Sequence, residues 1–294
     1  MAKEFKGVIP PVITSFGKDG KFDENAQREV ISFLTPKVNG FYPVGTYGSG
    51  PLMSVEERKR VAEVVIDEVG GRVPVIVHVG SPSTSQTVEL AKAAEAAGAD
   101  AVGAIPPYYY KYSDQDLLEH FRALIKSVRI PVFAYNNPGL SGNPLKPELI
   151  TTLAAEGLAG LKDSSFDLVT FYKYLDAVED PQFMHIIGTE AIAAPAIQSG
   201  AKGTVSGLAN VWPELMGELW ESLQKDHARE TAVIQKKVNQ ARNVMKYGST
   251  LVVCYEVLRL RGINAGIPRL PYLPLDGETA KRVKLGFEKL GLLN

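Results

Sequence analysis

Short apolar segments alternate with amphipathic helical segments along about the first 200 residues of the chain. The apolar segments are rich in Val and Ile and almost continuously hydrophobic, which is typical of parallel strands that are buried on both faces. This pattern predicts a parallel sheet covered by helices. The eight expected strands are 7–13, 40–45, 73–80, 99–107, 130–136, 158–163, 183–188 and 202–207.

Local signals mark the ends of the helical segments between these strands. Ser54 followed by Glu57 is a capping-box pattern, and Pro147 stands in a first helical turn, where its missing N–H costs nothing. Gly98 marks the expected C-terminal stop of another helix. The expected helices are 54–69, 83–99, 113–128, 146–156, 167–179 and 190–201.

Eight β–α units without a Gly, Pro or Ser-rich linker favour an α/β fold, the (β/α)8 or TIM barrel. A doubly wound open sheet is the alternative, but the first β–α turn lacks the G-x-G-x-x-G pattern of such folds. Residues 209–294 contain several further helices, interpreted as the eighth barrel helix and a C-terminal helical extension. The predicted domains are therefore a barrel at 1–225 and a helical domain at 226–294.

Composition excludes several classes of function. The net charge is -1 without a Lys/Arg-rich run, so nothing supports nucleic-acid binding. No apolar stretch approaches the roughly 18 residues of a membrane span, and the N-terminus lacks a signal-peptide pattern, so we expect a cytoplasmic protein. The single cysteine, Cys254, and four histidines without ligand spacing predict no metal site.

In a (β/α)8 barrel the chemistry lies at the C-terminal ends of the strands. There the sequence places Tyr135, Lys162 and, at 45–50, the turn "GTYGSG" with the hydroxyl of Thr46. Two of them have a plain structural alternative: Lys162 as a salt-bridged strand-end charge, and the glycines as positions that need a positive φ. No pair of acids with a histidine, and no Ser-His-Asp set, appears at the strand ends.

Together these residues suit a 2-oxo acid as substrate. A desolvated lysine amine has a lowered pKa and attacks carbonyl groups, and the Schiff base that forms is an electron sink. The covalent imine through Lys162 thus takes the place of a cofactor. A nearby phenol can move the proton that C–C bond cleavage requires, and backbone N–H groups of a glycine turn can hold a carboxylate.

Motifs in a fixed order extend this interpretation across the chain: "GVIPPVITSF", "GTYGSGPLMSVEER", "PPYYYKYS", "YNNPGLSG", "GLKDSS", "GAKGTVSGLAN" and "PRLPYLPLD". As a set they resemble the dihydrodipicolinate synthase / N-acetylneuraminate lyase superfamily of pyruvate-type class I aldolases. The resemblance implies a (β/α)8 barrel with a C-terminal helical domain and assembly as a homotetramer, a dimer of dimers.

The resemblance also implies roles for particular residues. Lys162 corresponds to the Schiff-base lysine, Tyr135 to the general acid/base and Thr46 to a relay hydroxyl. Tyr109 corresponds to a tyrosine that reaches across the dimer interface, and Val205 to the position whose carbonyl faces bound pyruvate. The expected substrate-binding set is Gly45, Tyr47, Gly48, Ser164, Gly188, Thr189, Glu190, Val205 and Ser206. Ser164 and its neighbour Ser165 have a second interpretation as helix caps, and Glu190 as a first-turn acid.

Departures from the family pattern bear on the substrate. Tyr47 replaces a hydroxyl residue, and Ser49 replaces an acid. No arginine lies between Tyr135 and Lys146, which disfavours the lysine-biosynthesis enzyme, because a bidentate arginine is hard to replace. Ala191 stands where sialic acid lyases have a second acid. The turn "GTYGSGP" most resembles that of 2-keto-3-deoxygluconate aldolases.

The favoured function is therefore a Schiff-base aldolase that reversibly cleaves a 2-oxo-3-deoxy sugar acid, such as 2-keto-3-deoxygluconate, to pyruvate and an aldehyde. Within the same chemistry the alternatives are N-acetylneuraminate lyase, 4-hydroxy-2-oxoglutarate aldolase and sugar-acid dehydratase. An alternative from another class is a non-catalytic protein that binds pyruvate-like ligands.

Overall fold

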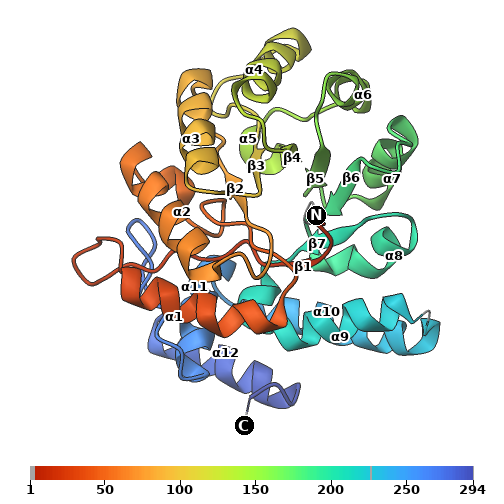
Figure 1. Cartoon of the computed structure of the whole chain (residues 1–294). Coiled ribbons are helices and arrows are strands. Elements are labelled where there is room, and N and C mark those ends of the chain that lie inside the picture. Colours follow the sequence, from red (N-terminus) through yellow and green to blue (C-terminus); the bar gives the residue numbers. More distant parts are fainter. Residues whose placement is uncertain (1–3, 226, 294) are drawn as a thin grey trace.

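A closed ring of parallel strands surrounded by helices forms the body of the molecule (Figure 1). The computed structural model describes residues 4–225 and 227–293. Within them the sheet order is β1-β7-β6-β5-β4-β3-β2, and each hydrogen-bonded pair is parallel. This confirms the predicted barrel. The strands are β1 Gly7–Ile9, β2 Ile76–His78, β3 Ala101–Ala104, β4 Val132–Asn136, β5 Gly160–Asp163, β6 Met184–Ile187 and β7 Gly203–Val205.

The expected strand at 40–45 is not a regular strand, although it closes the ring between β1 and β2. The Tyr42 N–H donates to the Pro10 carbonyl at 3.0 Å on one side, and the Ile76 N–H donates to the Phe41 carbonyl at 2.9 Å on the other. The ladder stops there because the chain then turns sharply, with φ 62° at Val44. The barrel thus has its eighth member in an irregular form.

Prolines make the strands shorter than the hydrophobic runs that predicted them. The run 7–13 is paired as a strand only to Ile9, because Pro10 has no N–H to donate to a ladder. The run 99–107 likewise ends as a strand at Ala104, two residues before Pro106. Hydrophobicity predicted where the strands lie but overestimated their length.

The helices around the ring follow the predicted capping signals. Both Ser54 and Ser113 form capping boxes, with Glu57 and Asp116 respectively. Pro147 occupies the first turn of its helix, as expected. The expected helix 190–201 is divided into a 3-10 turn and a short α-helix, and the helix at 24–34 lay outside the predicted set. No described helix combines the length and apolar character needed to cross a bilayer.

The α-helices of the barrel layer, with the short α5 that follows β4, are α1 Glu24–Leu34, α2 Val55–Val69, α3 Thr84–Ala96, α4 Asp114–Ser127, α5 Pro138–Ser141, α6 Pro147–Ala155, α7 Leu168–Ala177, α8 Ala193–Gln198 and α9 Pro213–Gln224. They are followed by α10 Ala228–Met245, α11 Thr250–Leu260 and α12 Gly277–Lys289. The 3-10 turns are η1 Thr35–Lys37, η2 Gly50–Leu52, η3 Glu190–Ile192 and η4 Leu208–Asn210.

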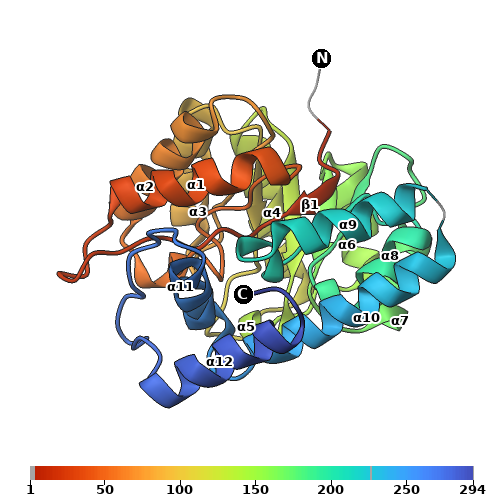
Figure 2. The same cartoon turned by 90° about the horizontal axis from the view of Figure 1, so that it is seen from below.

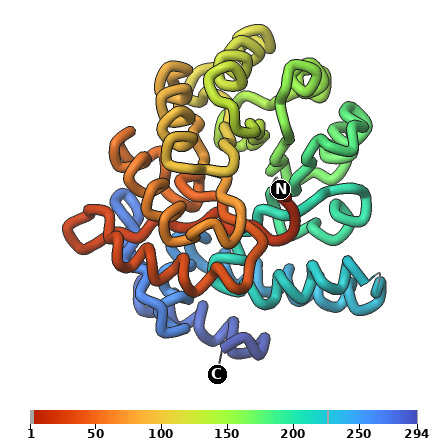
Figure 3. The backbone as a smooth tube through the Cα atoms, in the orientation of Figure 1, coloured from red at the N-terminus to blue at the C-terminus, as the bar shows by residue number. Residues whose placement is uncertain are grey.

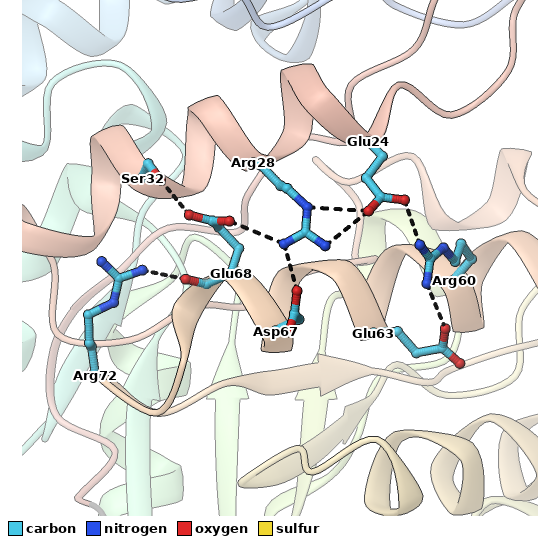
Figure 4. Close-up of polar contacts among 8 residues, drawn as sticks. All are labelled: Glu24, Arg28, Ser32, Arg60, Glu63, Asp67, Glu68 and Arg72. Carbon is cyan, nitrogen blue, oxygen red and sulfur yellow. Dashed lines mark hydrogen bonds and ion pairs between the residues drawn. The ribbon is translucent and has the colours of Figure 1, made fainter.

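A network of charged side chains joins α1 to α2 on the outer surface (Figure 4). Arg28 contacts Asp67 at 2.7 Å and Glu68 at 3.2 Å on α2, while Arg60 of α2 reaches back to Glu24 at 2.6 Å. Surface ion pairs contribute little each, typically about 0–1 kcal/mol, so this network adds orientation more than stability.

Alternation along the strands separates the lumen of the barrel from the layer beneath the helices. Phe133 belongs to a small cluster of lumen side chains, whereas its neighbour Ala134 belongs to the large outer core. Successive strand residues point to opposite faces, so Tyr135 and, on β5, Lys162 next to the outer-core Leu161 face the lumen. Below them the lumen is filled by Phe5, Ile9, Tyr42, Ile76, Ala101, Phe133, Ile186 and Val205.

The C-terminal helices α10, α11 and α12 lie on the side of the barrel where α5 follows the end of β4 (Figure 2). A loop before α12 is attached to the N-terminal part of the chain, as the adjoining red and blue parts of the tube show (Figure 3). There the Asn264 N–H donates to Glu29 at 2.8 Å, and the Ile267 N–H donates to the Phe16 carbonyl at 2.8 Å. The domain division at 225/226 stays a prediction, and residue 226 lies outside the described residues.

Candidate active site

A cavity of about 370 Å³ opens at the carboxyl ends of the strands, beneath the C-terminal helices. It brings together most of the residues that the sequence placed at strand ends. A larger groove, of about 1160 Å³, lies at the amino ends of the strands beside Phe5 and Met184, and no predicted site residue lines it. The predicted residues that line the 370 Å³ cavity are Thr46, Tyr47, Tyr135, Lys162, Ser164, Gly188, Thr189, Glu190 and Val205.

Lys162 lies at the floor of this cavity with only 4% of its surface exposed. Its Nζ is 3.6 Å from the ring centre of Tyr135 and 4.3 Å from that of Tyr42. Among the described residues no carboxylate lies within ion-pair distance, so the alternative of a salt-bridged strand-end charge is wrong. Burial lowers the pKa of the amine, partly opposed by Tyr135, and a larger neutral fraction makes it a better nucleophile.

Tyr135 stands beside Lys162 because the two residues are direct partners in the β4–β5 register. Its hydroxyl oxygen accepts a hydrogen bond of 2.9 Å from the side-chain amide of Asn137. Burial alone would raise the pKa of the phenol, but the charge of Lys162 and hydrogen bonding with Asn137, Ser164 and Thr46 lower it below its ordinary value. A phenol held in this way can both accept and return a proton.

The turn after residues 40–45 has unused backbone donors next to the cavity, which Thr46 and Tyr47 line. Within the described residues the N–H groups of Thr46, Tyr47 and Gly48 donate no hydrogen bond to the chain. Thr46 itself is exposed at the mouth. Consecutive free N–H groups in a turn form a site for an anion such as a carboxylate.

The glycines of this turn are required by close packing of the backbone. Gly45, Gly48 and Gly50 have no positive φ, so the alternative based on φ is wrong. A Cβ at Gly50 would lie 2.1 Å from the Val44 carbonyl oxygen, and one at Gly48 would lie 2.8 Å from the Val44 nitrogen. The turn is therefore folded tightly against itself, which fixes its free N–H groups in place.

Replacing Gly48 with alanine is expected to destabilise the protein by about 1–3 kcal/mol, the usual cost of forcing atoms into a packed region. It should also weaken pyruvate binding, because the turn must shift. Gly217→Ala on α9 is the matched control: a Cβ there meets nothing within 4 Å, and about 0.5–1 kcal/mol of stabilisation is expected. Urea unfolding of both variants checks this, and equal stabilities would contradict it.

One wall of the cavity combines the barrel with α10. Ser206 donates to Glu190 Oε2 at 3.1 Å, and Arg242 Nε of α10 lies 3.1 Å from Glu190 Oε1. Burial and the nearby charge of Glu190 raise the pKa of Tyr47, which keeps this phenol neutral. Glu190 does begin η3 as a first-turn acid, but its carboxylate is directed to Arg242 and Ser206. Ser206 lies behind the cavity wall and supports Glu190 rather than lining the cavity.

Ser164 and Gly188 form another part of the wall. Ser164 donates to the Gly188 carbonyl at 3.1 Å, and a Cβ at Gly188 would meet its Oγ at 2.0 Å. The N-cap of α7 is Asp167, so the interpretation of Ser164 as a helix cap is wrong. Thr189 caps η3 by accepting a hydrogen bond of 3.3 Å from the Ala191 N–H, while lining the cavity.

Tyr109 is not brought to the cavity within one chain. It is 87% exposed, has φ 84° and packs edge-on against Tyr110 with ring centres 5.0 Å apart. Its predicted role depends on a neighbouring subunit and stays a prediction.

Several cavity residues lay outside the sequence prediction. Arg242, Met245 and Thr250 come from the C-terminal helices, and Asn137 follows Tyr135 directly. Only Asn137 carried a local signal, because it stands at the same strand end as Tyr135. The helix residues reach the cavity through tertiary packing, which no local pattern encodes.

Comparison with known proteins agrees with this architecture. The model of the Dihydrodipicolinate synthetase family matches residues 4–289. An uncharacterized DapA-like lyase from Halobacterium salinarum is 37% identical, covering 98% of this chain and 94% of its own. A probable 2-dehydro-3-deoxy-D-pentonate aldolase, YjhH of Escherichia coli, is 36% identical over 81% of each chain. Other relatives are named 4-hydroxy-tetrahydrodipicolinate synthase.

Among solved structures, that of the Escherichia coli prophage protein YagE in complex with pyruvate has a TM-score of 0.94 and 29% identity, covering 98% of this chain and 99% of that one. The similarity in fold and sequence thus extends over barrel, cavity and C-terminal helices alike. The chain belongs to the dihydrodipicolinate synthetase family, whose named relatives include lyases and aldolases.

Proposed function

We propose that this chain is a class I aldolase that cleaves a 2-oxo-3-deoxy sugar acid to pyruvate and an aldehyde. The observation that carries the proposal is the pair at the cavity floor. A buried lysine with a lowered pKa lies 3.6 Å from the ring of a tyrosine whose pKa is also lowered. Nucleophile and acid/base are thus adjacent, as imine chemistry requires.

In the proposed reaction the neutral amine of Lys162 attacks C2 of the substrate. The C2 oxygen takes one proton from the amine and one from solvent and leaves as water, which gives an iminium ion. Tyr135 takes the proton of the C4 hydroxyl as the C3–C4 bond breaks. The electron pair of that bond forms the C2=C3 bond of a neutral enamine, and the aldehyde departs. Tyr135 returns the proton to C3, and water then hydrolyses the iminium ion to pyruvate and the free amine, with one proton returned to solvent. The imine is the electron sink, so the scheme uses no metal or cofactor.

The surroundings of the pair support this substrate class. The free N–H groups at 46–48 suit the C1 carboxylate, and the Thr46 hydroxyl serves as the proton relay. Ser164, Thr189 and Glu190 offer polar contacts to a hydroxylated tail. No arginine lies between Tyr135 and Lys146 to bind a second carboxylate, and the cavity residue in this stretch that follows Gly139 is Leu140, 58% exposed. This favours a sugar acid over the substrate of the lysine-biosynthesis enzyme.

The proposal includes a homotetramer in the cytoplasm, built as a dimer of dimers. Tyr109 at 87% exposure with a positive φ supports a contact that a second copy completes. In that assembly Tyr109 orients the proton relay of the neighbouring site.

Borohydride reduction in the presence of pyruvate tests the proposal. We expect one stable adduct, mapped by peptide mass spectrometry to Lys162, while the exposed Lys146 serves as an internal control that stays unmodified. No adduct, or an adduct at other lysines only, would overturn the mechanism.

Turnover assays then separate the substrates. 2-Keto-3-deoxygluconate, N-acetylneuraminate and 4-hydroxy-2-oxoglutarate are compared by pyruvate release, and the first is expected to have the highest kcat/KM. Dehydration of a sugar acid without pyruvate release would favour the dehydratase. Adduct formation without turnover of any sugar acid would favour the ligand-binding protein.

A further inference from the structure

Asn137 stands at a helix N-cap, but its side chain is hydrogen-bonded to Tyr135 in the cavity and not to the helix. It is the N-cap residue of α5, and asparagine is favoured at N-caps because its side-chain oxygen accepts helix N–H groups. Here the side chain makes no cap hydrogen bond. Its Nδ2 instead donates to the hydroxyl oxygen of Tyr135 at 2.9 Å, and the residue is only 7% exposed.

The backbone that carries this amide is held from both sides. The Asn137 carbonyl accepts hydrogen bonds from the Ser141 N–H at 2.9 Å and the Ser141 hydroxyl at 3.0 Å. Asn136, its neighbour, donates to the buried Asp163 at 2.7 Å and accepts from the Leu145 N–H at 3.0 Å. The backbone that carries the Asn137 side chain is therefore fixed on both sides, which places its amide within reach of Tyr135.

We infer that Asn137 is a positioning residue for Tyr135, which holds the phenol toward Lys162 and favours its tyrosinate form by donating a hydrogen bond to the oxygen. The inference rests on the proposed function, since it assigns the control of the same acid/base. A hydrogen bond to a charged acceptor is stronger than one to a neutral acceptor, so the donation stabilises the deprotonated phenol more than the protonated phenol.

Three titratable groups face Tyr135, and only one of them carries a charge that can stabilise its tyrosinate. They are Lys162 on β5, Tyr42 with ring centres 6.2 Å apart, and His78 on β2 at 6.0 Å. Burial holds the pKa of His78 well below its ordinary value, so this ring is neutral, and burial raises the pKa of Tyr42, so its phenol is neutral too. Of these three side chains, Lys162 is thus the one that can be positively charged.

The charge of Lys162 does not persist through the reaction. In the proposed scheme its nitrogen is positive in the iminium ion and neutral in the enamine, because the pair of the broken bond forms C2=C3 and displaces the C2=N π pair onto nitrogen. At that moment the tyrosine loses its neighbouring charge, whereas the Asn137 amide remains. The hydroxyls of Ser164 and Thr46 can turn to donate or accept, but an amide N–H can only donate.

Deuterium exchange into the methyl group of pyruvate tests this inference without an aldehyde substrate. Within the iminium ion a C3–H bond breaks, the proton goes to Tyr135, and the electron pair forms the enamine. A deuteron from solvent then returns through Tyr135. NMR gives the exchange rate as a function of pD for the wild type, Asn137→Leu and Asn137→Asp, and borohydride trapping is measured in parallel.

Asn137→Leu removes the donor at similar size, and Asn137→Asp keeps the shape but places a carboxylate beside the phenol. We expect both variants to retain trapping at Lys162 and to exchange about 10–100-fold more slowly at neutral pD. The limb on which the rate rises with pD should move to higher pD, and further in Asn137→Asp, because the pKa of Tyr135 rises.

Asn143→Leu is the matched control, because Asn143 supports the neighbouring loop by donating to the Pro107 carbonyl at 2.9 Å and does not contact Tyr135. It should lower Tm without moving the exchange limb. The inference would be overturned if the pD dependence of the exchange rate were unchanged in both Asn137 variants, or if it shifted equally in Asn143→Leu. Trapping at Lys162 in the wild type would still uphold the proposed function in that case. Absence of trapping in the wild type would overturn the proposed function instead.

Discussion

Replacing Lys162 with methionine is expected to abolish borohydride trapping and reduce turnover on the order of 10⁶-fold, the scale of loss when a covalent nucleophile is removed. Methionine has a similar length and no charge, so it can occupy the space between the Tyr42 and Tyr135 rings without a large change in volume. Trapping and pyruvate release measure the effect. Residual adduct formation in this variant would show that another amine carries the reaction.

The same substitution is expected to stabilise the fold, with a defined pH dependence. Burial lowers the pKa of Lys162 below its ordinary value of 10.5. The native state is therefore penalised most below the folded pKa, where the amine must be buried as a cation, and the penalty disappears above the ordinary value. The gain from Lys162→Met in urea unfolding should be larger at pH 6 than at pH 11. A gain that grows with pH would contradict this sign.

Tyr135→Phe is expected to separate imine formation from proton transfer. The amine of Lys162 stays in place, so the pyruvate adduct should still form, whereas turnover should fall about 10²–10⁴-fold through loss of the acid/base. The native tyrosine has a lowered pKa, so the wild-type rate should rise with pH below the ordinary range of a phenol. This rise of the rate with pH should be absent in Tyr135→Phe.

Removal of the hydroxyl also leaves the Asn137 amide without its acceptor, which costs about 1–3 kcal/mol for a buried donor. Tyr272→Phe is the matched control, since this tyrosine is 38% exposed in a loop and lines no part of the cavity. It should keep wild-type turnover and stability. An unchanged rate in Tyr135→Phe would remove Tyr135 from its proposed role.

The floor of the site could be predicted because strand chemistry is local. A lysine and a tyrosine at the ends of two consecutive apolar runs become direct partners once the strands pair in parallel, and the structure has this register. The same reasoning misjudged 40–45, since hydrophobicity does not reveal a positive φ at Val44 that ends regular pairing. It also could not distinguish φ from backbone crowding as the reason for the glycines.

The sequence predicted the wall residues that lie at strand ends but not those that come from the C-terminal helices. Glu190 was expected from its strand end, but its partner Arg242 lies on a helix much later in the chain, and only tertiary packing brings them to 3.1 Å. Asn137 stands in "YNNPGLSG" but was not among the expected site residues, and N-cap preference is the usual explanation of such an asparagine. The predicted role of Tyr109 depends on a second chain, which a single sequence does not supply.

The apolar side chains that fill the lumen below Lys162 also dictate the order of events in the proposed reaction. Phe133, Ile186 and Val205 close the floor, so reactants enter and leave through the mouth beneath the C-terminal helices. In the proposed reaction C1, C2 and C3, the carbons that become pyruvate, lie deepest, because C2 is bonded to the amine of Lys162. The rest of the substrate lies between them and solvent. The aldehyde must therefore leave first and pyruvate last, and in the reverse direction pyruvate must enter before its partner: a kinetic sequence imposed by a closed floor.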